Sequence, residues 1–128
     1  MRLLLDTHVL LWAKANPERM SFDLHALIAD PANEPLFSTA SIWEVAIKQS
    51  QRREDFRVDA AVLRRSLLES GYTELPVLGE HAIAVAALPQ IHQDPFDRML
   101  VAQAMVEGID LLTVDRQLAR YQGPVRLF

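Results

Sequence analysis

The chain has 128 residues, of which 50% are hydrophobic, and this size and composition suit one domain with its own apolar core. It contains no cysteine, which excludes disulfides, zinc–thiolate sites and thiol nucleophiles. The formal net charge of −4 disfavours a general nucleic-acid binder, and no apolar stretch approaches the roughly 18 to 20 residues that would span a bilayer. We therefore expect a soluble cytoplasmic protein.

The first half of the chain predicts two strands, each followed by helices. Residues 2–6 form an apolar run without alternation, which is typical of a strand buried on both faces. Ser21 favours the start of a helix and Asp30-Pro31 ends it. The expected elements are a strand at 2–6, a helix through 9–13 that continues to Asn16-Pro17, a helix at Phe22–Ala29, a strand at Leu36–Ser38, and a helix capped by Thr39 or Ser41 that runs to about Gln51.

The second half of the chain continues the alternation of helices and strands. Asp59 favours a helix start, whereas Gly71 and Gly108 are typical helix stops. Pro76, within the short apolar run 75–78, indicates an edge strand or a strand start. The expected elements are a charged turn at Arg52–Asp55, a helix at Ala60–Glu69, a strand at Leu75–Leu78, a helix at Glu80–Leu88 closed by Pro89, a helix at Pro95–Glu107, a strand at Leu111–Val114, a helical turn at Arg116–Tyr121 and a strand at Val125–Leu127.

Strands that alternate with helices indicate an α/β fold, in which a parallel sheet carries helices on both faces. The sequence has no internal repeat, no low-complexity tract and no linker rich enough to divide it. We therefore expect residues 1–128 to form a single domain.

Four carboxylates stand where such a fold would bring them together, namely Asp6, Glu44, Asp97 and Asp115. Two follow strand runs and two lie near helix starts, and α/β proteins bind ligands outside the carboxyl ends of their strands. Two carboxylates about 5 Å apart repel by roughly 3 kcal/mol at an effective dielectric of about 20. Such a cluster either takes up protons or holds a hard cation, and oxygen ligands favour Mg²⁺ or Mn²⁺. The pattern therefore points to a metal centre of the kind that hydrolyses phosphodiesters.

Each of these acids also has a purely structural explanation. Asp6 and Asp115 could cap the helices that follow them. Glu44 lies four residues before Lys48, an order that gives a surface ion pair worth a few tenths of a kcal/mol. The neighbours of Glu44 are nearly all apolar, however, which disfavours a freely solvated position. Taken singly each acid favours a structural role, but jointly they favour a site.

The run Asp94-Pro95-Phe96-Asp97 is the sharpest local signal. Asp94 fits an N-cap, Pro95 fits the first helical position and Asp97 fits the third. Both acids would also stabilise a helix start through the helix dipole. A carboxylate at a helix start can bind a metal as well, so the structural and the functional interpretation both stay open.

Other residues carry weaker signals. His8 and His92 flank two of the acids and could contact phosphate, although a hydrogen-bonding or solvated role is commoner for a lone histidine. Trp12 and Trp43 are interpreted first as core or subunit-interface residues, and second as nucleobase-stacking residues. The arginine-rich stretch 52–65 is interpreted first as a solvated helix face, and alternatively as a phosphate-contacting rim or a docking site for an acidic partner.

Four segments resemble the motifs of the PIN-domain nucleases, and they look most like the VapC-type toxins of bacterial toxin–antitoxin pairs. The segments read LLLDTH at 3–8, STASIWEVAIK at 38–48, HQDPFDR at 92–98 and LTVDR at 112–116. They span almost the whole chain, appear in the family order and match the four acidic positions without departure.

This resemblance implies an α/β/α sandwich around a parallel sheet of about five strands, and a Mg²⁺- or Mn²⁺-dependent endoribonuclease. It implies that Asp6 and Asp97 are the main metal ligands. Glu44 and Asp115 would bind a second ion, position waters or orient the other ligands, and Asp94 is an extra acid with a secondary role. The resemblance also implies a homodimer that cleaves RNA and is silenced by a VapB-type antitoxin, whose C-terminal segment fills the groove near the acids.

Two alternative functions stay open. One is a non-cleaving PIN-like module that binds RNA or a protein, and the complete set of acids argues against it. The other is a metal-dependent phosphatase or phosphotransferase with Asp6 as its nucleophile. Such enzymes usually carry a second Asp two positions later, where this chain has His8.

Overall fold

The structure is a computed structural model that describes residues 1–51 and 57–128. Its strands form one five-stranded, all-parallel sheet in the order β3-β2-β1-β4-β5. The strands are β1 (Arg2–Leu5), β2 (Glu34–Ser38), β3 (Thr73–Leu75), β4 (Asp110–Thr113) and β5 (Val125–Leu127). The α-helices of the described residues are α1 (Thr7–Ala15), α2 (Phe22–Ala29), α3 (Thr39–Ser50), α4 (Ala60–Glu69), α5 (Gly79–Ala84) and α6 (Pro95–Glu107). Short 3₁₀ turns lie at Pro17–Arg19, Val85–Ala87 and Leu118–Arg120.

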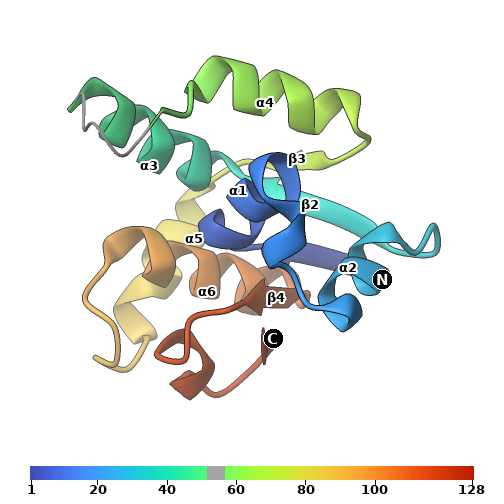
Figure 1. Ribbon diagram of the computed structural model, residues 1–128. Coiled ribbons are helices and arrows are strands. Elements are labelled where there is room, and N and C mark those ends of the chain that lie inside the picture. The colour runs from blue at the N-terminus through green and yellow to red at the C-terminus, as the bar shows by residue number, and fades with distance from the viewer. Residues whose placement is uncertain (52–56) are drawn as a thin grey trace.

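Helices cover both faces of the sheet, and Figure 1 shows α3 and α4 on one side of it and α5 and α6 on the other. Leu3 and Leu5 pack with Val9 of α1 on one face, whereas Leu4 packs with Leu100 of α6 on the opposite face. Because successive side chains of a strand point to opposite faces, the single apolar run of β1 supplies both cores. The predicted α/β/α fold with a parallel sheet of about five strands is therefore confirmed.

Three helices begin and end where their terminal residues predict, namely α2, α4 and α6. Ser21 Oγ accepts the amide hydrogen of Leu24 at 3.2 Å, and Asp59 Oδ1 accepts that of Val62 at 3.0 Å. Gly108 follows α6 with a φ of 66°, a left-handed conformation that glycine adopts without the steric cost of a side chain. Strong local capping thus fixes these boundaries.

The third strand is placed too late by the sequence. The prediction put it at Leu75–Leu78, whereas β3 is Thr73–Leu75 and pairs with β2 at one edge of the sheet. Pro76 has no amide hydrogen, so the chain cannot continue the ladder beyond Leu75. The position at an edge, which Pro76 indicated, is confirmed.

The expected caps of the third helix are also wrong. Ser38 is the N-cap of α3, and its Oγ accepts the amide hydrogen of Ala40 at 3.0 Å. Thr39 and Ser41, the predicted caps, lie inside the helix. Thr39 Oγ1 instead accepts the amide hydrogen of Val77 at 3.1 Å, which ties the loop after β3 to the start of α3.

Smaller differences concern the ends of elements. The expected helix Glu80–Leu88 is α5 followed by a 3₁₀ turn at Val85–Ala87, and the helical turn expected at Arg116–Tyr121 is a shorter 3₁₀ turn at Leu118–Arg120. The charged turn predicted at Arg52–Asp55 lies outside the described residues. Within the described ranges, no helix is long and apolar enough to cross a membrane.

The topology places two helix starts and one turn at the same edge of the sheet. All strands run parallel, so the carboxyl ends of β1, β2 and β4 point the same way. Asp6 lies between β1 and α1, while Ser38 ends β2 and begins α3. This edge is where parallel α/β folds bind their ligands, and it carries the predicted acids.

Candidate active site

Asp6 is anchored between two strands and a helix. Only 1% of its surface is exposed. Its Oδ1 accepts the amide hydrogen of Val9 at 2.8 Å, which makes it the N-cap of α1, and its Oδ2 accepts a hydrogen bond from the hydroxyl of Thr113. Thr113 Oγ1 in turn accepts the amide hydrogen of Asp115 at 3.0 Å. One buried threonine therefore joins the carboxylate after β1 to the turn after β4.

Glu44 reaches the same edge from the second turn of α3. It is 7% exposed, and its Oε1 accepts a 2.8 Å hydrogen bond from the hydroxyl of Thr7. Thr7 also lies 2.9 Å from Ser41 Oγ, which serves as its donor because the single Thr7 hydrogen is given to the carboxylate. Lys48 Nζ lies 3.3 Å from Glu44 Oε2, so the predicted ion pair is confirmed beside an inward-facing carboxylate.

Asp94 and Asp97 occupy the first turn of α6. Asp94 is the N-cap, and its Oδ1 accepts the amide hydrogens of Phe96 at 2.8 Å and of Asp97 at 3.4 Å, as the motif predicts. The carboxylate of Asp97 is left to face the other acids. The pKa of Asp97 is raised to about 7, first by burial and then by the negative charges of Asp94, Glu44 and Asp6, while His92 acts in the opposite direction.

The pKa of Asp6 is raised as well. Burial is the main cause, and the negative charge of Asp115 adds to it. The hydrogen bonds from Thr113 and Val9 and the nearby charge of His8 act in the opposite direction. The environment of Asp6 and Asp97 thus disfavours their charged forms. A bound cation would relieve this cost, as expected at a cation site.

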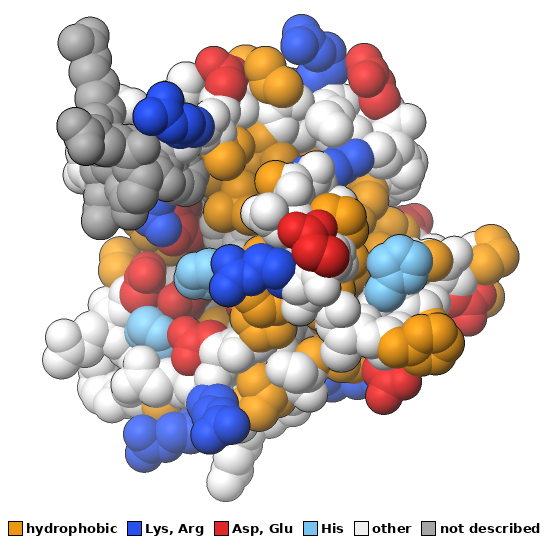
Figure 2. Space-filling view, viewed as in Figure 1, with side chains coloured by type: hydrophobic (Ala, Val, Ile, Leu, Met, Phe, Trp, Pro, Cys, Tyr) orange, Lys and Arg blue, Asp and Glu red, His pale blue; other side chains and the backbone are white. Residues whose placement is uncertain are grey.

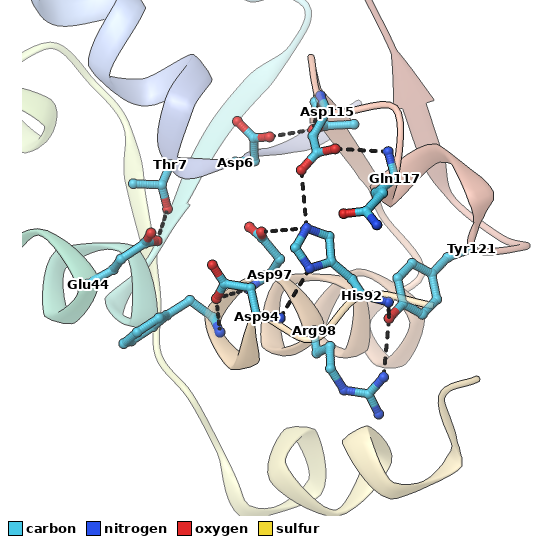
Figure 3. Close-up of polar contacts among 12 residues, drawn as sticks. Asp6, Thr7, Glu44, His92, Asp94, Asp97, Arg98, Asp115, Gln117 and Tyr121 are labelled. Carbon is cyan, nitrogen blue, oxygen red and sulfur yellow. Dashed lines mark hydrogen bonds and ion pairs between the residues drawn. The ribbon is translucent and has the colours of Figure 1, made fainter. Parts of the chain in front are cut away.

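His92 lies between two of the acids, and Figure 3 shows its ring between Asp97 and Asp115. Its Nε2 is 3.3 Å from Asp97 Oδ2 and 3.2 Å from Asp115 Oδ2. Asp115 Oδ1 accepts the amide hydrogen of Gln117 at 2.8 Å. The 3₁₀ turn Leu118–Arg120 has Gln117 at its N-cap position and no side-chain cap, so the predicted capping role of Asp115 is wrong. The sequence placed His92 only near the acids, because one of its two carboxylate partners, Asp115, lies 23 positions away along the chain.

The structure therefore brings together the four predicted acids, which we call the acidic site: Asp6, Glu44, Asp97 and Asp115. Figure 2 shows acidic side chains gathered with histidines on one flank of the molecule. A groove of about 450 Å³ opens beside them, and its lining includes Glu44, Lys48, Asp94 and Phe96. Such a groove gives an extended, charged ligand access to the carboxylates.

Several other predicted residues lie apart from this group. His8 is exposed, and its charge lowers the pKa of Asp6. Trp43 is 64% exposed and contacts Phe96 edge-on at 5.1 Å, so its interpretation as a core residue is wrong. Arg64 pairs with Glu74 at 2.7 Å, which supports the helix-face interpretation for that arginine.

A second group of possible metal ligands lies where the start of α5 meets the end of α6. Glu80, His81 and Glu107 place their ligand atoms within 4.8 Å of one another. However, His81 Nδ1 accepts the amide hydrogen of Leu78 at 2.9 Å, so the ring proton is on Nε2, which faces Glu107 at 2.9 Å. His81 thus accepts a hydrogen bond at the start of α5 and donates one to Glu107, and these two bonds explain the group without a metal.

Comparisons with known proteins agree with this geometry. Residues 3–124 match the model of the PIN domain family. The chain is 31% identical over 122 residues to Ribonuclease VapC22 of Mycobacterium tuberculosis, with 95% of this chain and 93% of that protein covered. The fold is similar to that of VapBC2 from Rickettsia felis, solved with a DNA fragment from their promoter (TM-score 0.74, 13% identity, 100% of this chain and 99% of that chain). It is also similar to DNA-bound VapBC from Salmonella typhimurium (TM-score 0.64, 15% identity, 98% and 97%).

Proposed function

The chain belongs to the PIN-domain family and, within it, to the VapC ribonucleases, the nuclease toxins of toxin–antitoxin pairs, and from this premise we propose that its acidic site cleaves RNA with the help of a divalent metal ion. The proposal rests on one observation above all. Carboxylates from four separate elements gather at the carboxyl edge of the sheet. Thr113 and His92 join Asp6, Asp115 and Asp97. Thr7 holds Glu44 close enough for its charge to act on Asp97.

The chemistry of the donors fits a hard divalent cation. All the acids of the site offer carboxylate oxygens, which are the ligands that Mg²⁺ and Mn²⁺ prefer. Asp6 and Asp97, whose pKa values are raised, would hold the ion, with Glu44, Asp115 and Asp94 in secondary positions. A bound ion would lower the pKa of a water molecule and neutralise charge on the scissile phosphate.

The residues of this chain contribute by fixing the carboxylates before RNA arrives. Thr113 holds one oxygen of Asp6 and the backbone of Asp115, and Thr7 holds one oxygen of Glu44. Side chains fixed in this way need little reorganisation as charge develops in the transition state. In the reaction, a water oxygen bonds to phosphorus and one P–O ester bond breaks. The products are a phosphate monoester and a hydroxyl. One proton of the water passes to a carboxylate of the acidic site, and the departing oxygen takes the other to become that hydroxyl.

The antitoxin of this protein is, in our proposal, a VapB-type chain. Two structural relatives are parts of VapBC complexes, which supports such a partner. The groove beside the acidic site, with Glu44 and Asp94 in its lining, suits a segment that carries positive charge. Both the antitoxin and the RNA would be met in the cytoplasm, and we propose that residues 1–128 act there as one PIN domain.

We also propose that the protein forms a homodimer through the apolar surface around Trp43. A groove of about 530 Å³ next to that side chain is lined by Val77, Phe96 and Met99 among others. Trp43 lines this groove and is itself 64% exposed. An exposed tryptophan beside an apolar groove is typical of protein–protein contacts.

The direct test is cleavage of total bacterial RNA by the wild type and by Asp6→Asn. Each protein is incubated with Mg²⁺, with Mn²⁺ or with EDTA, and the RNA ends are mapped. We expect cuts that need the metal and disappear in the variant. A matched control is Glu69→Gln, an exposed acid of α4 far from the site, which should cut as the wild type does.

Absence of cuts with every metal, in a sample that mass spectrometry finds free of antitoxin, would favour the non-cleaving module. A phosphoenzyme trapped on Asp6 with a phosphate mimic would favour the phosphatase. Equal cleavage by the wild type and Asp6→Asn would remove Asp6 from the mechanism.

A further inference from the structure

The hydrogen bonds of His92 define which of its ring nitrogens carries the proton. The amide nitrogen of Asp94 donates to Nδ1 at 3.1 Å, so Nδ1 acts as an acceptor through its lone pair. The ring hydrogen is therefore on Nε2, which lies 3.3 Å from Asp97 Oδ2 and 3.2 Å from Asp115 Oδ2. In this tautomer the ring is a donor placed between two carboxylates.

The backbone of His92 is fixed by a second set of bonds, drawn in Figure 3. Its amide nitrogen donates to the hydroxyl oxygen of Tyr121 at 3.0 Å, and Arg98 Nη1 donates to the same oxygen at 3.2 Å. Tyr121 is 3% exposed and Arg98 is 8% exposed, so this anchor is buried. It joins the loop before α6 to the turn that precedes β5.

Arg98 holds the segment leading to His92 at two further points. Its guanidinium donates to the carbonyl oxygen of Pro89 at 2.9 Å and to that of Val85 at 3.1 Å. Arg98 follows Asp97 directly on α6, and its guanidinium donates to two carbonyls and a phenol. Arg98 thus helps to anchor His92, which contacts the neighbouring carboxylate of Asp97.

From these contacts we propose that His92 is a positioning residue of the acidic site, which orients Asp97 and Asp115 toward each other without itself binding the metal; this rests on the proposed function and deepens it. The two carboxylates belong to α6 and to the turn after β4, and their ligand oxygens lie within 4.8 Å. A donor shared between them offsets their repulsion and sets their orientation. Each carboxylate keeps its other oxygen for further contacts.

The same geometry argues against a ligand role for His92. A metal ligand would need the lone pair of Nε2, and the hydrogen would then have to move to Nδ1. There it would meet the amide hydrogen of Asp94, so two donors would face each other at 3.1 Å. Asp94 therefore has a backbone role that fixes the ring, besides the cap that its carboxylate gives to α6.

The first test reads the ring nitrogens directly. In protein labelled with ¹⁵N-histidine, long-range ¹H–¹⁵N correlation spectra identify the protonated nitrogen of each ring, and His92→Gln assigns the signals. We expect His92 to carry its hydrogen on Nε2 both in EDTA and with saturating Mg²⁺. Loss of that hydrogen when Mg²⁺ is added, or a hydrogen on Nδ1, would overturn the proposal. This readout needs no RNA cleavage, so it separates a failure of this inference from a failure of the proposed nuclease activity.

The second test compares variants that keep or remove the donor. The amide of His92→Gln can replace the Nε2 donor, whereas His92→Leu removes it at similar volume. We expect His92→Leu to lower Mn²⁺ affinity by calorimetry and kcat by about 10- to 100-fold, with KM for RNA nearly unchanged, and His92→Gln to recover most of both. Tyr121→Phe, which removes the anchor, should act in the same direction but more weakly.

Two controls exclude a general structural effect. Thermal denaturation should show that His92→Leu is folded. The control His25→Gln, at an exposed histidine of α2, should match the wild type in Mn²⁺ affinity and in RNA cleavage. Equal losses in His92→Leu and His92→Gln would contradict a role as donor, and an unchanged Mn²⁺ affinity together with an unchanged kcat in His92→Leu would contradict any positioning role.

Discussion

Replacement of Asp97 by asparagine should stabilise the metal-free protein. Burial and the neighbouring acids raise the pKa of Asp97 from 3.8 to about 7, which means that the folded protein resists the charged form. At about 1.4 kcal/mol per pKa unit, the full cost of the charge would be about 4 kcal/mol for a sealed group. The Asp97 side chain is 16% exposed, and solvent screening reduces this to about 2 kcal/mol. In a protein of this size that corresponds to a rise in Tm of roughly 8 °C.

The stabilisation should depend on pH in a defined direction. Between pH 4 and 7 the folded protein retains the proton on Asp97 and the unfolded chain has lost it, so wild-type stability falls as the pH rises through this window. The stability of Asp97→Asn does not fall in this way, because asparagine has no proton to lose. The difference in Tm between the variant and the wild type should therefore be larger at pH 8 than at pH 5.

The assay is thermal denaturation in EDTA at both pH values, repeated at pH 8 with saturating Mn²⁺. Glu69→Gln, at an exposed acid, is the isosteric control and should shift the stability by less than about 0.5 kcal/mol. Mn²⁺ should raise the Tm of the wild type more than that of Asp97→Asn. A variant less stable than the wild type at pH 8 in EDTA, or a difference independent of pH, would refute the electrostatic argument.

Three further predictions follow from other contacts. Thr113→Val removes the donor to Asp6 and the acceptor for the amide of Asp115, so RNA cleavage and Mn²⁺ affinity should fall by about tenfold or more while circular dichroism stays native. Trp43→Ser should shift the protein from dimer to monomer in light scattering after gel filtration, and an unchanged mass would remove this surface from the interface. Arg64→Ala should cost no more than about 1 kcal/mol in urea denaturation, because its pair with Glu74 is solvent-exposed; a larger cost would reveal a structural role.

The sequence predicts best those features that depend on neighbouring residues. The helix α6 begins at Pro95 because Asp94 caps it and ends at Gly108 because that residue adopts a left-handed conformation. Both signals lie within a few positions of the boundary. The apolar runs of β1 and β4 likewise identify central strands, although β4 begins one residue earlier than predicted, at Asp110.

Contacts between distant residues could not be predicted in this way. Ser38 caps α3 in preference to Thr39 because the chain turns at the end of β2, and Thr39 is occupied by the loop after β3. The link from Thr113 to Asp6 spans two strands that are neighbours in the sheet and remote in sequence. The partner of Thr113 therefore follows from the strand order and not from its neighbours in the sequence.

The position of His92 shows the same limit in the acidic site. Residue types and positions singled out the four acids, because several carboxylates near strand ends and helix starts jointly favour a site. The role of His92 depends on its contacts with Asp115 and Tyr121, which lie 23 and 29 positions away. Only the folded arrangement of α6 and the turn after β4 brings these groups together.

The most direct measurement of the central claim is a crystal structure with Mn²⁺, located by its anomalous scattering. The account predicts a peak bound by carboxylate oxygens of Asp6 and Asp97, with Glu44 and Asp115 nearby. A peak at Glu80, His81 and Glu107 instead, with none in the acidic site, would contradict the account, because those residues form the rival group of possible ligands.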